Sequence, residues 1–119
     1  MIKRFVRTGK KQGKKVGVLI AVVNDDNKIV IGHSKWNRKI DPYNPAFGEK
    51  VATKRIESDS SVEPASSITR EYVDFARRAI RYFKGAELSE GTTKALTKAS
   101  LELAAREAAK HQVDLGSGC

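Results

Sequence analysis

The sequence predicts an α+β fold, in which a small antiparallel β-sheet of at least three strands is followed by three helices. β-branched residues dominate three runs within residues 1–36, and helical periodicity begins only after residue 44. A chain of 119 residues has room for one core, because domains of this size bury about two thirds of their unfolded surface. We therefore predict a single domain over 1–119, with a β-meander (1–36), a helical part (45–113) and a flexible tail (114–119).

The predicted strands are Ile2–Thr8, Lys15–Val23 and Lys28–Trp36. The second is continuously apolar, which predicts a central strand covered on both faces. Asn24–Asn27 predicts a hairpin turn, because Asn and Asp accept positive φ. The first connection, Gly9–Lys15, gathers four lysines around two glycines and is either a solvated hairpin tip or a loop that contacts phosphate.

The first helix is predicted to begin with Asn44 as cap and Pro45 in the first turn, and to end near Glu57. On a helical wheel Arg55 falls inside the apolar arc, which contains Phe47, Val51, Ala52 and Ile56. A guanidinium in an apolar arc is either paired with an internal carboxylate or faces a cleft in which an anion binds. A polar loop over residues 58–67 follows.

The second helix is predicted to begin at a Thr69 cap and to end after Lys84, where Gly85 supplies a left-handed residue. Its apolar face contains Tyr72, Phe75, Ala76, Ala79, Ile80 and Phe83. The opposite side forms a basic stripe of Arg70, Arg77, Arg78, Arg81 and Lys84, interrupted only by Asp74.

The third helix is predicted from a Ser89 cap to Val113. Its apolar residues are mainly alanine, which permits close helix packing but buries little area. We therefore predict a homo-oligomer in which these helices pack between subunits.

The net charge of +9, from 23 Lys and Arg against 14 Asp and Glu, predicts a surface that attracts anions. Nucleotides, nucleic acids and acidic protein surfaces are the candidate partners. The lone cysteine, Cys119, excludes an intrachain disulfide. The sequence has no apolar run long enough for a membrane helix and no secretory signal, so we expect a cytoplasmic protein without a membrane partner.

Catalytic and metal-binding motifs are absent from the sequence. The two histidines, His33 and His111, have no metal-ligand spacing, and neither a nucleophile elbow nor a Walker motif occurs. We therefore expect a binding protein and not an enzyme, with no metal and no cofactor.

The segment after the third strand combines the parts that a nucleotide ligand requires. Aromatic rings can stack on a base, amides can read its edge, and cations and a helix N-terminus can bind phosphate. The alternative is that the two aromatic side chains only cover the end of the sheet. The candidate residues here are Ser34, Lys35, Trp36, Asn37, Arg38 and Tyr43.

Two stretches carry a family resemblance: Lys15–Ala21, and residues 29–55, which read IVIGHSKWNRKIDPYNPAFGEKVATKR. The order of a strand, IGxS, a polar loop, FG and a helix with a basic residue resembles the phage anti-Thoeris sponge proteins over about residues 15–84. The resemblance implies a homo-oligomer that holds cyclic ADP-ribose-type signals or cyclic oligonucleotides between subunits without hydrolysing them, in the cytoplasm of an infected bacterium. It assigns Ser34 and its neighbours, together with Arg55, to the ligand site.

Two functional hypotheses follow. In the first, residues 34–45 and Arg55, with one or more of Arg70, Arg77 and Arg81, sequester a small anionic nucleotide and counter host antiphage defence. In the alternative, the basic stripe and the lysine-rich hairpin bind the phosphates of nucleic acid. Docking to an acidic host protein is a third possibility.

Overall fold

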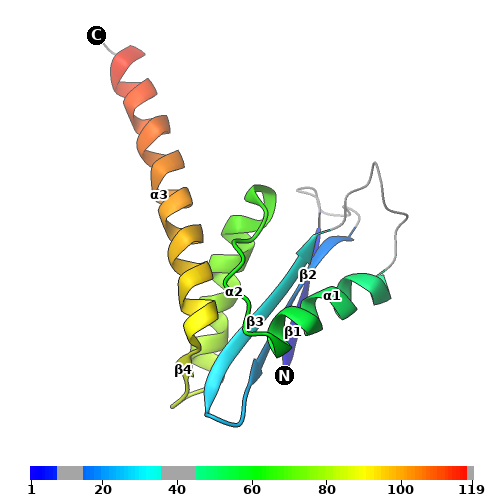
Figure 1. Cartoon of the computed structure of the whole chain (residues 1–119). Coiled ribbons are helices and arrows are strands. Elements are labelled where there is room, and N and C mark those ends of the chain that lie inside the picture. The colour runs from blue at the N-terminus through cyan, green and yellow to red at the C-terminus, as the bar shows by residue number, and fades with distance from the viewer. Residues whose placement is uncertain (8–14, 36–44, 118–119) are drawn as a thin grey trace.

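The computed structural model describes residues 1–7, 15–35 and 45–117 (Figure 1). Its elements are β1 (Ile2–Arg7), β2 (Lys15–Val23), β3 (Lys28–Lys35), α1 (Pro45–Glu57), the 3₁₀ turn η1 (Ser66–Ile68), α2 (Thr69–Tyr82), β4 (Glu87–Leu88) and α3 (Glu90–Ser117). The strands form one sheet in the order β1-β2-β3-β4. Helix α1 covers one face of this sheet, while α2 and α3 lie on the other (Figure 1).

The predicted α+β fold and its three antiparallel strands are confirmed, but the sheet is mixed. The fourth strand, Glu87–Leu88, pairs in parallel with Lys28–Ile29. It forms because the chain turns back after α2 at Gly85, whose φ of +86° matches the predicted left-handed residue. Two residues are too short to carry the alternation that identifies a strand in a sequence, so β4 was not predicted.

The continuous apolar run of β2 is explained by its central position, as predicted. Leu19 and Ala21 belong to the main core beneath α2 and α3, whereas Val18 and Ile20 pack against α1 on the other face. Successive side chains of a strand point to opposite faces, so a strand covered on both sides is apolar at every position.

Helix α1 lies very close to β3 because Gly32 has no side chain. A Cβ at Gly32 would lie 2.1 Å from the carbonyl oxygen of Ala52. Ala52 is fully buried, as predicted, but Phe47 is 55% exposed and the prediction that it joins the apolar arc against the sheet is wrong. The helical wheel identifies a face but does not say how much of the helix length the sheet covers.

Helix α2 packs along the sheet through the predicted apolar face, of which Tyr72 and Phe75 are the largest buried side chains. Three details of the prediction are wrong. The helix ends at Tyr82 and not after Lys84, because the chain already leaves the helical conformation at Phe83. Ile80 is 44% exposed, because it lies at the margin of the buried face. The Thr69 hydroxyl donates to the carbonyl of Ala65 in the preceding 3₁₀ turn and does not cap the helix.

Helix α3 begins at the predicted cap, where the Thr92 N–H donates to Ser89 Oγ at 3.3 Å. The Asp59 carboxylate also binds this helix start, accepting from Ser89 Oγ at 2.6 Å and from the Gly91 N–H at 3.2 Å. The helix continues to Ser117, past the predicted end at Val113. Its second half projects well beyond the rest of the molecule (Figure 1).

Candidate functional site

The candidate site lies at the outer edge of β3, whose backbone groups are bound by other elements. The Ser89 N–H donates to the carbonyl of Ile29 at 2.9 Å, and the Ile31 N–H donates to Thr92 Oγ1 at 3.0 Å. Two residues further along, Arg55 Nη1 donates to the carbonyl of His33 at 2.6 Å. Together these groups occupy an edge that would otherwise expose free backbone donors and acceptors.

The same Arg55 nitrogen lies 3.1 Å from His33 Nδ1, and this contact determines the protonation state of the imidazole. A guanidinium only donates, so Nδ1 carries no hydrogen. His33 Nε2 lies 2.9 Å from the carbonyl of Val62, which only accepts, so the hydrogen resides on Nε2. His33 is therefore neutral. Burial, together with the charge of Arg55, lowers its pKa against the opposing effect of the Val62 hydrogen bond.

No described carboxylate neutralises Arg55. Its hydrogen bonds in the described part of the chain go to the neutral acceptors of His33, and no described Asp or Glu lies at ion-pair distance. The sequence left two interpretations of Arg55, an internal ion pair or a position facing an anion-binding cleft. The internal ion pair is not formed with any described residue. Nη1 is engaged, whereas Nη2 and Nε keep donors that point to no described acceptor.

An aromatic ring supports the imidazole from the other side. Tyr72 packs edge-on against His33, with ring centroids 5.6 Å apart and planes at 87°. Tyr72 is fully buried, and its hydroxyl has no hydrogen-bond partner among the described residues. Burial and the nearby negative charge of Asp59 raise the pKa of this hydroxyl. The uncharged side chain of Tyr72 therefore packs against His33 and restricts its position.

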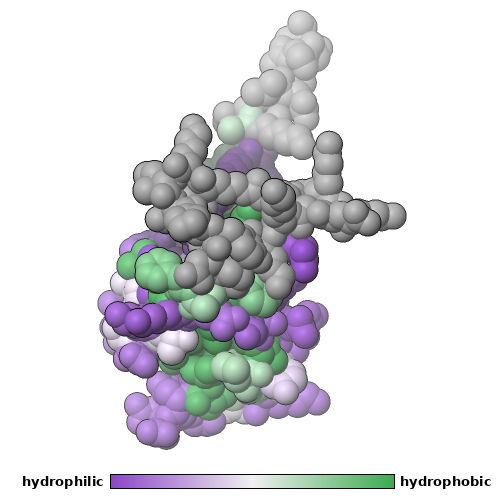
Figure 2. All heavy atoms as spheres, turned by 90° about the vertical axis from the view of Figure 1, so that its right-hand side faces the viewer, coloured by the Kyte–Doolittle hydropathy of each residue, from purple (hydrophilic) through white to green (hydrophobic). Residues whose placement is uncertain are grey.

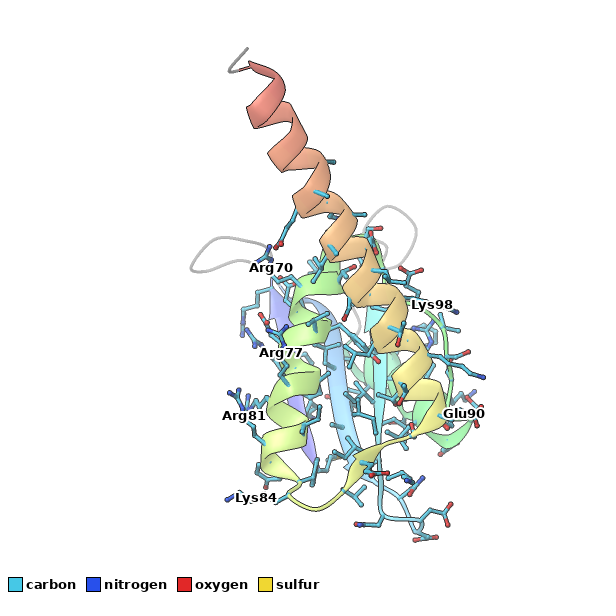
Figure 3. The ribbon with its side chains drawn as sticks, turned by 90° about the vertical axis from the view of Figure 1, so that its left-hand side faces the viewer. Arg70, Arg77, Arg81, Lys84, Glu90 and Lys98 are labelled. Carbon is cyan, nitrogen blue, oxygen red and sulfur yellow. The ribbon has the colours of Figure 1, made fainter. Side chains whose placement is uncertain are left out.

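The structure places the predicted site residues in two regions. Ser34, which is buried, and Lys35, which is exposed, end β3 close to Arg55. Trp36, Asn37, Arg38 and Tyr43 lie outside the described residues, as does the lysine-rich loop. Arg70, Arg77 and Arg81 are exposed on α2, across the sheet from α1 (Figure 3). A single chain therefore does not bring them together with Arg55.

Sequence reasoning did not place His33 in the candidate site, since it was weighed only as a metal ligand or catalyst. One signal was available. His33 is separated from Ile29 and Ile31 by an even number of residues along the strand. Alternation therefore places its side chain on the same face of the sheet as theirs, the face that α2 and α3 cover. Its bonds to Arg55 and Val62 carried no signal, because they join segments 22 and 29 residues away.

Hydrophobic side chains also reach the surface beside α1. Figure 2 views this side of the molecule and shows them between polar patches. Phe5, Val22 and Ile56 are the partly buried residues that surround the small core under α1. One helix alone is too narrow to cover this face of the sheet.

Comparison with known proteins found no matching family model, no matching curated protein and no matching solved structure. Among the described residues, no group of three or more His, Cys, Asp or Glu side chains is placed to hold a metal ion. In the same part of the chain, no helix has the length and apolar character needed to span a membrane.

Proposed function

We propose that this protein sequesters a small anionic nucleotide at the end of β3 and does not cleave it. One observation carries the proposal: Arg55 is held by neutral acceptors of His33, so its full positive charge remains close to the end of β3 at Lys35, after which residues 36–44 follow. A charge that is positioned but not neutralised has a high affinity for an anion, because no internal partner must be displaced.

The remaining donors of Arg55 suit a phosphate group. Nη2 and Nε form one edge of the guanidinium fork, the geometry that binds two phosphate oxygens at once. The N-terminus of α1 lies about 15 Å along the helix from Arg55, at 1.5 Å per residue, so its N–H groups would serve a second phosphate of the ligand. Trp36 and Tyr43 belong to the segment between β3 and α1 and are candidates for stacking on a base.

The state of His33 supports binding without catalysis. Both ring nitrogens are already engaged, Nδ1 with Arg55 and Nε2 with Val62. Neither is available to take a proton from a ligand or from water, which is the task of a general base. In this proposal His33 positions Arg55 and has no chemical role.

The proposal includes a homo-oligomer with ligand sites between subunits. Ala95 and Ala99 of α3 are buried against the domain, whereas Leu101 is 66% exposed. At 100° per residue, Leu101 and the exposed Ala104 and Ala108 lie roughly opposite that buried side, with the exposed Ala105 beside them. A second subunit packed there, or on the apolar surface beside α1, would supply the cations that one chain keeps apart from Arg55. We expect the protein to act in the cytoplasm of a phage-infected bacterium.

Mass spectrometry tests the proposal directly. The protein is incubated separately with cyclic ADP-ribose and with a cyclic dinucleotide, freed of unbound ligand by gel filtration and denatured by heat. We expect release of an intact nucleotide in a fixed ratio to subunits. Recovery of a hydrolysed product, or of no nucleotide from either incubation, would contradict the proposal.

A matched pair of variants tests the site. Arg55→Gln removes the charge but keeps an amide donor, and we expect it to lose ligand retention. Lys54→Gln changes the net charge equally from an exposed position on the same helix, and we expect it to retain the ligand. Equal retention by both variants would remove Arg55 from the site.

A further inference from the structure

We propose that the outer face of α2 is a second anion-binding surface, which binds the phosphate backbone of double-stranded nucleic acid without regard to sequence. This basic face consists of Arg70, Arg77, Arg78, Arg81 and Lys84, all of which are exposed. Within one chain it lies on the other side of the sheet from Arg55, so the two anion-binding surfaces are separate there.

The basic face is long and straight. Its labelled side chains follow one another along α2, and Arg77, Arg81 and Lys84 project on the side away from α3 (Figure 3). From Arg70 to Arg81 the helical rise is about 16 Å, at 1.5 Å per residue, and Lys84 follows in the turn after α2. One strand of a duplex carries a phosphate about every 3.4 Å along its axis, so the face matches a run of roughly five phosphates and not a single small ligand.

The charge of this face is almost entirely free. Within the described residues only Arg70 approaches a carboxylate, that of Glu107 at 3.9 Å, and both side chains are about 70% exposed. Such an exposed pair contributes little. Asp74 lies among the five cations but pairs with none of them at ion-pair distance in the described structure. The protein leaves these guanidinium groups available to external anions.

The surroundings of α2 favour nucleic acid over a membrane. The apolar side of the helix is buried in the core, with Tyr72, Phe75 and Ala76 all at 0% exposure, so it has no face to insert into a bilayer. Four of the five cations are arginines, whose forked donors match phosphate.

A duplex fits the face better than a single strand. Tyr82 is exposed near the end of the face, but its ring packs edge-on against Phe83 with centroids 4.8 Å apart. Single-strand binding usually relies on aromatic rings that stack on successive bases. The basic face presents cations alone, and contacts to phosphate carry no sequence information.

The experiment measures binding of the full chain to a fluorescent 20-base-pair duplex of mixed sequence, by anisotropy between 50 and 200 mM NaCl. We expect log K to fall linearly with log salt, with a slope of about −3 to −4, since each neutralised phosphate contributes about −0.9. The double variant Arg77→Gln/Arg81→Gln is expected to flatten the slope by about two and to lower affinity at least tenfold at 50 mM salt.

The control is Lys50→Gln/Lys54→Gln, which removes the same net charge from exposed positions on α1. It is expected to keep the wild-type slope, and so is Arg77→Lys/Arg81→Lys, which keeps the charge on α2. A flat salt response of the wild type, or equal losses in the two glutamine variants, would overturn the proposal. The proposal would also be overturned if Arg77→Gln/Arg81→Gln lost nucleotide retention but kept duplex binding. That result would assign Arg77 and Arg81 to a small-ligand site between subunits.

Discussion

Arg55 on α1 donates from a single nitrogen to both the carbonyl oxygen of His33, at 2.6 Å, and the Nδ1 of its imidazole, at 3.1 Å. The pair joins the end of a helix to the edge of the sheet through neutral acceptors, so the link retains the guanidinium charge. The imidazole in turn is positioned by the carbonyl of Val62 and the ring of Tyr72. The contact between Arg55 and His33 therefore holds α1 against the sheet and also keeps a positive charge at the sheet edge.

Removal of Arg55 should destabilise the fold. In Arg55→Ala the partly buried carbonyl of His33 loses its donor, and an acceptor left without a partner costs about 1–3 kcal/mol. We expect a loss of this size in the free energy of unfolding, measured by urea denaturation at pH 7. Lys54→Ala, an exposed neighbour, should change it by less than about 0.5 kcal/mol. Equal stability of the two variants would show that the contact contributes nothing.

Stability should fall in mild acid because of His33. Its pKa is lowered in the folded protein from the ordinary value of 6.5, so the unfolded chain binds the proton more readily. The contribution of neutral His33 is then complete above pH 6.5 and is lost as the pH falls below that value. Urea denaturation between pH 5 and pH 7.5 measures this slope. His33→Gln should flatten it.

The close approach of α1 to the sheet should make Gly32 intolerant of substitution. In Gly32→Ala the new Cβ would meet the backbone of Ala52 at 2.1 Å, so the helix that carries Arg55 must move. We expect a loss of more than about 3 kcal/mol, above the usual range for overpacking, because the obstacle is backbone. Gly85→Ala provides the comparison. It meets no atom within 4 Å but has φ of +86°, and should cost only about 1–2 kcal/mol of conformational strain.

The exposed side of α3 should control subunit association. Leu101→Glu places a charge on the apolar side of the projecting helix, and we expect it to convert an oligomer to monomers in light scattering at about 20–50 μM, since association depends on concentration. The thermal midpoint of the isolated domain should change little, because Leu101 is exposed. Ser100→Glu is the matched control and should leave the mass unchanged. A monomeric wild type would contradict the proposed oligomer.

Local periodicity determined much of this protein from the sequence alone. The unbroken apolar run of β2 identified a central strand, and the two-sided pattern of α2 separated its buried face from its cations, because each pattern reports a face that a single element presents. The starts of α1 and α3 were likewise predicted from residues at the helix ends.

Tertiary structure alone decided the partner of Arg55, the exposure of Phe47, the replacement of the Thr69 cap by a 3₁₀ turn and the addition of β4. The Thr69 contact with Ala65 is local, but the other features depend on atoms from distant segments. The acceptor for Arg55 is partly a backbone carbonyl, which every residue possesses and no side-chain pattern reveals. The order of side chains along α1 predicted that Arg55 lies within the apolar arc of the helix. Only the tertiary structure determined that the neutral acceptors of His33 bind Arg55 and leave its charge without a described carboxylate partner.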